Sequence, residues 1–150
     1  MSIPAQKNKK VWILESLYKT LVSSAKIDPE VLRQEFSDYK DGDEFEHPLF
    51  CHNVGADPNK YLRHVHFKPF TPDKAKEWEL MYESDYDYKR RTSDCYVLYA
   101  EDKRNGYLII DLLFDPGAHG IWKLRYTKLA KAEEIAENFC VFGAGKLPCQ

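Results

Sequence analysis

Two neighbouring apolar segments constrain the fold of this chain more than any other feature. Cys95–Ala100 is apolar throughout, and Tyr107–Phe114 is apolar apart from Asp111. The polar stretch between them ends in Gly106, which is typical of a tight turn between two strands. The two segments therefore predict a β-hairpin. Because its second strand is almost continuously apolar, we expect that strand to lie inside a sheet that is covered on both faces.

Two further segments have the pattern of strands. Val11–Leu14 is β-prone, and Tyr61–Phe67 alternates until prolines follow, which remove the donors of a strand ladder. Asp43–Lys60 shows no period and contains glycine and prolines, so it is expected to be a long loop. The sequence thus predicts an antiparallel sheet of about four strands.

Three segments have the pattern of helices. Asp28 can cap a helix whose first turn holds Pro29 and which ends at Asp41-Gly42. A short helix is expected over Asp73–Met81, capped by Thr71 or Asp73, and a longer one over Ile121–Phe139, where apolar residues recur at helical spacing. Strands mixed with helices before, between and after them predict an α+β fold.

Length and composition fit one soluble domain. The 150 residues are 43% hydrophobic and 31% charged, so we expect a single domain over 11–140, a flexible arm over 1–10 and a tail over 141–150. The net charge of −2 argues against a protein devoted to nucleic-acid binding, although the basic residues are clustered along the chain. Ser2–Lys10 does not resemble a signal peptide, and no apolar run nears the length of a membrane span. The four cysteines form no CxxC pair, which favours reduced thiols in a cytoplasmic protein.

A pair of histidines lies within the strand expected at Tyr61–Phe67. His64 and His66 are two residues apart, so on a strand they share one face. Such a pair can bind a metal, act as general acid and base, or include a ring that is simply packed in the core. No carboxylate flanks the pair to complete a metal site. We therefore expect no metal and no cofactor.

Two other stretches carry complementary chemistry. Arg90 and Arg91 precede a strand and can offer planar forks to a phosphate, with Asp94 close enough to hold a guanidinium or orient a histidine. A surface arginine–aspartate pair of little energetic weight is the alternative. His119 follows the exit of the most apolar strand, and two cations come next, Lys123 and Arg125. His47 and His52 fall in the expected loop, where a histidine is most often only solvated.

Cleavage of RNA without a metal requires parts of these kinds. A base removes the proton of the 2′-OH, an acid protonates the leaving 5′ oxygen, and cations stabilise the charge on the phosphorus oxygens. The three stretches therefore predict one site that acts on a phosphodiester. We expect four catalytic residues and four that contact RNA: His64, His66, Arg91 and His119 for the first, and Arg90, Thr92, Lys123 and Arg125 for the second.

Short motifs in this order resemble the YafO-type toxins of type II toxin–antitoxin modules. The motifs are Glu35–Gly42, His64-Val65-His66, Arg91–Asp94 followed by Val97-Leu98-Tyr99, Leu108-Ile109-Ile110 with the downstream His119, and Glu134–Phe139. The matching polar positions are His64, His66, Arg91, Thr92, Asp94 and His119, and we expect Asp94 and Tyr99 to support the site.

The resemblance implies a RelE-like ribonuclease fold with a twisted antiparallel sheet. It also implies a ribosome-dependent mRNA interferase, with the ribosome, mRNA and a cognate antitoxin as partners and no membrane partner. The chain departs from the family in its slightly acidic charge, its longer N-terminal arm and its cysteine-containing tail. Two alternatives stay open: a related toxin delivered between cells that cleaves tRNA, and a non-enzymatic protein-binding module on the same fold.

Overall fold

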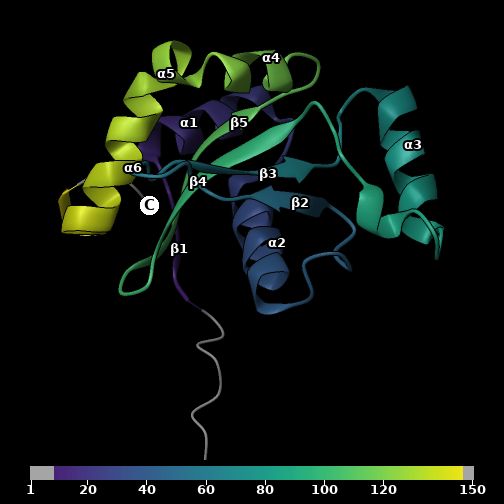
Figure 1. Cartoon of the computed structure of the whole chain (residues 1–150), viewed down its shortest axis with the longest axis horizontal. Coiled ribbons are helices and arrows are strands. Elements are labelled where there is room, and N and C mark those ends of the chain that lie inside the picture. Colours follow the sequence, from purple (N-terminus) through teal and green to yellow (C-terminus); the bar gives the residue numbers. More distant parts are fainter. Residues whose placement is uncertain (1–8, 147–150) are drawn as a thin grey trace, which may run out of the picture.

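A five-stranded sheet forms the centre of the protein. The computed structural model describes residues 9–146 (Figure 1). The sheet has the order β1-β5-β4-β3-β2, and all neighbours are antiparallel except β1 and β5, which run parallel. Its strands are β1 Val11–Ile13, β2 Phe50–Val54, β3 Arg63–Phe67, β4 Tyr96–Asp102 and β5 Gly106–Leu113.

The prediction of about four antiparallel strands was therefore wrong in two respects, although the α+β class is confirmed. The missed strand, β2, lies in the segment expected to be a loop. It was missed because it is a short edge strand whose pairing with β3 is interrupted by a bulge between Cys51 and Asn53. The parallel pairing places Val11 opposite Tyr107. Strand direction leaves no trace in the apolar period, so the sequence pattern did not reveal it.

The predicted hairpin of β4 and β5 is present and needs glycine at its turn. Gly106 has a φ of 94°, and a Cβ at that position would lie 2.2 Å from the carbonyl oxygen of Lys10. The next amide, of Tyr107, donates to the same carbonyl at 2.9 Å. The turn therefore also secures the entry of β1 into the sheet.

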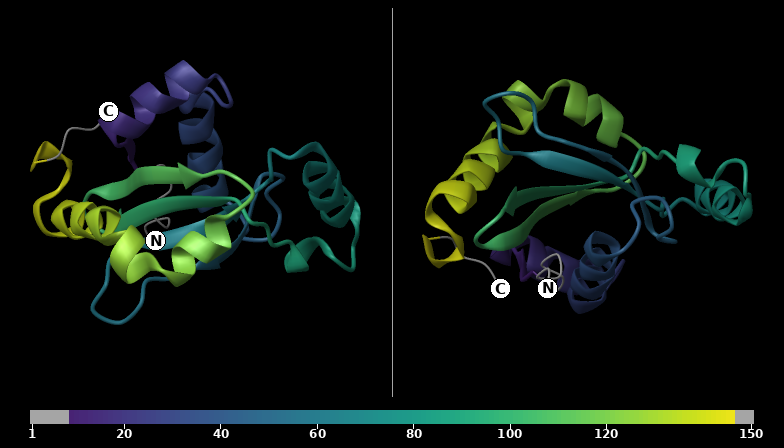
Figure 2. Two further views of the ribbon diagram at one scale, coloured as in Figure 1. Left: turned by 90° about the horizontal axis from the view of Figure 1, so that it is seen from above. Right: turned by 60° about the horizontal axis from the view of Figure 1, so that its bottom comes forward.

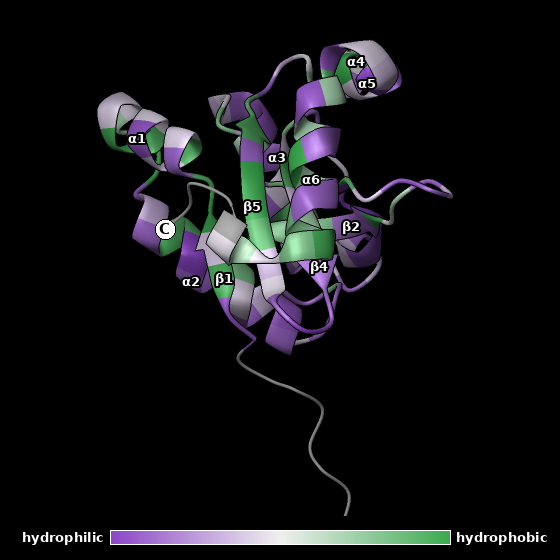
Figure 3. Cartoon of the chain, turned by 90° about the vertical axis from the view of Figure 1, so that its left-hand side faces the viewer, coloured by the Kyte–Doolittle hydropathy of each residue, from purple (hydrophilic) through white to green (hydrophobic). Residues whose placement is uncertain are grey.

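Helices cover both faces of the sheet (Figure 2). The helices are α1 Glu15–Ser24, α2 Pro29–Asp41, α3 Pro72–Glu83, α4 Ala118–Lys123, α5 Arg125–Lys128 and α6 Ala130–Phe142. On one face, the ring of Phe36 in α2 makes edge contacts with Phe50, Tyr99 and Tyr107. The helices α4 to α6 cover the other face, and α3 stands at one end of the sheet. Figure 3 shows that β5 is hydrophobic along most of its length, as expected of an interior strand.

The helix starts were predicted better than the last helix. The Oδ1 atom of Asp28 accepts a hydrogen bond of 2.8 Å from the amide of Glu30, which confirms the expected cap of α2. The expected helix over 121–139 is wrong as a single element. It is interrupted at Leu124 and Leu129, whose backbone leaves the helical region, and Leu124 is 52% exposed although the period assigned it to the apolar stripe. The interruption directs Arg125 toward the β2–β3 connection.

The chain ends are described only in part. The arm expected over 1–10 lies outside the described residues up to position 8, and α6 continues into the expected tail as far as Phe142, with a short 3₁₀ turn at Ala144–Lys146. Residues 147–150 of the tail also lie outside them. Among residues 9–146, no helix is both long and apolar enough to cross a membrane.

Candidate functional site

A hollow of about 750 Å³ lies on the face of β2, β3 and β4 that α4 borders. It gathers four of the five histidines of the chain. Of the predicted site residues, five line it: His64, His66, Thr92, Asp94 and His119. The remaining lining residues are His52, Val54, Ser93, Tyr96, Gly120 and Trp122. Segments that are distant in the sequence thus meet at one place, as the three stretches predicted.

His64 lies deep in the wall of the hollow. Its ring stacks on Tyr96 of β4 with centroids 4.2 Å apart, and the indole of Trp122 lies 4.1 Å away on α4. Only 3% of the residue is exposed, and its Nδ1 has no hydrogen-bond partner in the described structure. Burial, together with the neighbouring imidazoles of His66 and His52, lowers the pKa of His64 to about 3. His64 is therefore neutral at neutral pH.

His66 is held in one tautomer. The amide of Ser93 donates a hydrogen bond of 2.7 Å to its Nδ1, so the neutral ring carries its proton on Nε2. Burial lowers the pKa of His66 to about 4, and His52 acts in the same direction. The two histidines of β3 share one face as predicted, but their lowered pKa values make them weak bases, so they are better suited to hydrogen bonding and packing.

His52 is a site residue that the sequence did not reveal. It occupies the bulge of β2 with a φ of 57°, and its exposed ring meets that of His66 at 4.8 Å and nearly at right angles. A bulge redirects a side chain relative to the regular alternation of a strand. Because β2 itself carries no clear period, no sequence signal distinguished His52 from a solvated loop histidine.

His119 reaches the hollow from the start of α4. The carboxylate of Asp94 accepts hydrogen bonds from the backbone amides of Gly117 and His119, the latter at 2.6 Å. The exposed ring of His119 lies with Nδ1 3.1 Å from the hydroxyl of Tyr96. Asp94 thus positions a histidine through its backbone.

Arg91 lies outside the hollow. Its guanidinium is fully buried and donates to the carbonyl oxygens of Tyr88, His47 and Phe45 at 2.7–2.9 Å. The rings of Trp78 and Tyr82 each lie 4.8 Å from its Cζ atom. This arrangement ties the segment before β2 to α3, which is a structural role.

The other predicted site residues are dispersed. Tyr99 faces the opposite side of the sheet, where its hydroxyl donates to Oδ1 of Asn53 at 2.6 Å and accepts from Nζ of Lys40 at 2.8 Å. The exposed Arg90 stacks on Tyr86. Lys123 is exposed on α4 without lining the hollow, and Arg125 lines a second pocket on the other side of Trp122.

The described side chains include no metal-binding group. Among residues 9–146, no cluster of three or more histidine, cysteine, aspartate or glutamate side chains is arranged to hold an ion. In the hollow, Nδ1 of His66 is already occupied by the amide of Ser93. That nitrogen is therefore not available as a ligand atom.

Comparison with protein families identifies the chain. Residues 37–141 match the family model of the toxin YafO of type II toxin–antitoxin systems. The match extends from α2 to α6 and includes every residue that lines the hollow. Comparisons with curated proteins and with solved structures gave no match. Because the family model covers well over half of the 150 residues, the chain belongs to the YafO family of type II toxins, whose systems pair each toxin with an antitoxin.

Proposed function

We propose that this toxin is an endoribonuclease that cleaves mRNA on the ribosome, in the cytoplasm, by general acid–base chemistry without a metal. The observation that carries the proposal is the gathering of four histidines and the Tyr96 hydroxyl around one hollow. A RelE-like fold is part of the proposal, and the antiparallel run from β2 to β5 with helices on both faces supports it.

The two exposed histidines are the proton-transfer pair. His52 and His119 lie at the hollow with rings open to solvent, whereas the other two rings are buried. One imidazole removes the proton of the 2′-OH, whose oxygen then forms a bond to phosphorus. The bond from phosphorus to the 5′ oxygen breaks, and the other imidazole protonates that oxygen. The products are a 2′,3′-cyclic phosphate and a free 5′-hydroxyl.

The buried groups donate hydrogen bonds to the reacting phosphate and form the wall beside it. Because Nδ1 of His66 accepts from Ser93, the Nε2–H of the neutral ring is available as a donor, and a neutral imidazole can polarise a reacting oxygen in this way. Thr92 adds a hydroxyl at the hollow. His64 forms a wall between Tyr96 and Trp122. Arg91 is not in this catalytic set, because its donors are used by backbone carbonyls.

Growth arrest on induced expression tests the proposal. We expect His119→Ala and His52→Ala each to lower RNA cleavage by about 10²- to 10⁴-fold, the usual contribution of a general acid or base, and to relieve growth arrest. His47→Gln is the matched control, because His47 is the one histidine that does not line the hollow and instead bonds Glu35. Undiminished arrest in both alanine variants would remove the hollow from the mechanism.

Mapping of RNA ends from arrested cells separates the substrates. New ends within translated mRNA, and cleavage in vitro that requires added ribosomes, are expected. Ends confined to tRNA would favour the tRNA-cleaving alternative. Arrest without any new RNA ends would favour a protein-binding module.

A further inference from the structure

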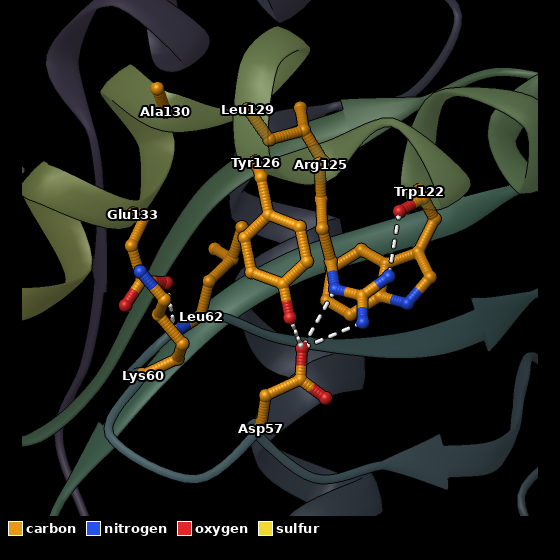
Figure 4. A pocket seen from close by; sticks show the side chains of 9 residues that line it. All are labelled: Asp57, Lys60, Leu62, Trp122, Arg125, Tyr126, Leu129, Ala130 and Glu133. Atoms are coloured by element: carbon orange, nitrogen blue, oxygen red, sulfur yellow. Dashed lines mark hydrogen bonds and ion pairs between the residues drawn. The ribbon is translucent and has the colours of Figure 1, made fainter.

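A second pocket of about 130 Å³ adjoins the hollow (Figure 4). It is enclosed by the β2–β3 connection on one side and by α4, α5 and the start of α6 on the other. Trp122 lines both the pocket and the hollow, so a single indole separates them. We propose that this pocket binds a pyrimidine base of the RNA, from a nucleotide next to the one whose phosphodiester occupies the hollow. The proposal rests on the proposed ribonuclease function.

The walls of the pocket are suited to stacking. The guanidinium of Arg125 lies 5.1 Å from the ring of Trp122 and 4.8 Å from the ring of Tyr126. Tyr126 is 60% exposed. The buried side chains of Leu62 and Leu129 complete the apolar lining. Aromatic rings and arginine planes are the surfaces on which proteins stack single-stranded bases.

Hydrogen bonds to two carboxylates hold the walls of the pocket together. Oδ2 of Asp57 accepts from Nε and Nη2 of Arg125 at 2.8 and 2.7 Å and from the hydroxyl of Tyr126 at 3.0 Å. The carboxylate of Glu133 accepts from the amides of Tyr61 and Leu62 at 2.6 and 2.9 Å. These two carboxylates fasten the β2–β3 connection to α5 and α6, as the dashed lines in Figure 4 show for both. Because these contacts already order the walls of the pocket, binding costs little further conformational entropy, which favours affinity.

The size of the pocket selects the smaller bases. A protein cavity of about 150 Å³ accepts benzene, so a pocket of about 130 Å³ is on the scale of a single six-membered ring, which favours a pyrimidine over the fused rings of a purine. Both oxygens of Glu133 and Oδ2 of Asp57 already accept hydrogen bonds, and Nζ of Lys60 lies over the ring of Tyr126 at 5.5 Å as an exposed donor. The ammonium of Lys60 can donate to the carbonyl oxygens of a pyrimidine.

Titration of the His119→Ala protein, in which RNA cleavage is expected to be strongly reduced, with nucleoside monophosphates tests the inference. We expect UMP and CMP to bind at least tenfold more tightly than AMP, GMP or inorganic phosphate, with backbone NMR shifts at Lys60 and Tyr126. Tyr126→Ala removes a stacking surface and is expected to weaken UMP binding about tenfold. Tyr126→Phe keeps the ring, and its affinity for UMP is expected to stay within about threefold of that of the His119→Ala protein. Tyr86→Ala, which removes a tyrosine that is 77% exposed and outside the pocket, is the matched control.

Mapping of cut sites in cells supplies an independent readout. With the wild type, a pyrimidine is expected at one position beside the cut, and the cuts that Tyr126→Ala still makes are expected to lose that preference. Equal binding of purines or phosphate, or an unchanged preference in Tyr126→Ala, would overturn the pyrimidine pocket and leave the nuclease standing. Binding of UMP that depends on Tyr126, in a protein that cleaves no RNA, would support the pocket and overturn the nuclease.

Discussion

The amide of Ser93 donates a 2.7 Å hydrogen bond to Nδ1 of His66, and this contact links the segment before β4 to the end of β3. The next residue, Asp94, bonds the amide of His119 at the start of α4. Two consecutive residues therefore orient two histidines that come from different elements. The segment Arg90–Asp94 was expected to act through its arginines, but it acts on the site mainly through Ser93 and Asp94.

The buried histidines should make the protein sensitive to acid. The folded pKa values of His64 and His66, about 3 and 4, lie below the ordinary value near 6.5. Their contribution to stability is thus fully present above pH 6.5 and is lost as the pH falls toward 4, because the unfolded chain binds the protons first. We expect each to lower the free energy of unfolding by about 2 kcal/mol between pH 7.5 and pH 5.

Urea unfolding at a series of pH values measures this loss. His64→Phe keeps a ring between Tyr96 and Trp122 and removes the titrating group. The variant is expected to lose about 2 kcal/mol less than the wild type over the same interval. Identical pH dependence in both proteins would mean that the pKa of His64 is the same in the folded and the unfolded chain. His47, whose pKa burial also lowers, is retained in both and acts in the same direction.

Asp94 should support both folding and cleavage without contacting RNA. Asp94→Ala removes the acceptor of the Gly117 and His119 amides, and we expect a loss of about 1–2 kcal/mol in the free energy of unfolding, as for a lost helix cap. Cleavage by the folded variant should fall as well, because His119 is no longer oriented. Asp73→Ala in the first turn of α3 is the control, with an expected change of about 0.5 kcal/mol. Wild-type cleavage by folded Asp94→Ala would contradict the positioning role.

The faces of the strands could be predicted from the sequence, whereas their partners could not. Alternation alone placed His64 and His66 together, and the exit of an apolar strand marked His119 as accessible. The contribution of His52 depends on a bulge at the sheet edge, which alternation does not record. The burial of Arg91 depends on carbonyls that lie more than 40 residues earlier in the chain, at Phe45 and His47.

Gly106 should be required for the entry of β1 into the sheet. Gly106→Ala would place a Cβ 2.2 Å from the carbonyl oxygen of Lys10 at a φ of 94°, and we expect thermal or urea unfolding to show a loss of at least about 2 kcal/mol. Gly120→Ala is the contrasting control. No heavy atom lies within 4 Å of its Cβ, and it lies in α4, so a gain of up to about 1 kcal/mol is expected. Similar effects of the two substitutions would contradict the argument from close approach.

Arg91 should prove structural rather than catalytic. A lysine ammonium cannot reproduce the planar fork that bonds three carbonyl oxygens between two rings, so Arg91→Lys is expected to lower the free energy of unfolding by about 3 kcal/mol through buried acceptors left unpaired. Arg90→Lys, at the exposed neighbouring position, should change it by less than about 0.5 kcal/mol. Unfolding and RNA cleavage are to be measured on the same preparations. If Arg91→Lys retained wild-type stability and lost cleavage, the guanidinium would have to reach the phosphate, and the catalytic assignment expected from the sequence would be restored.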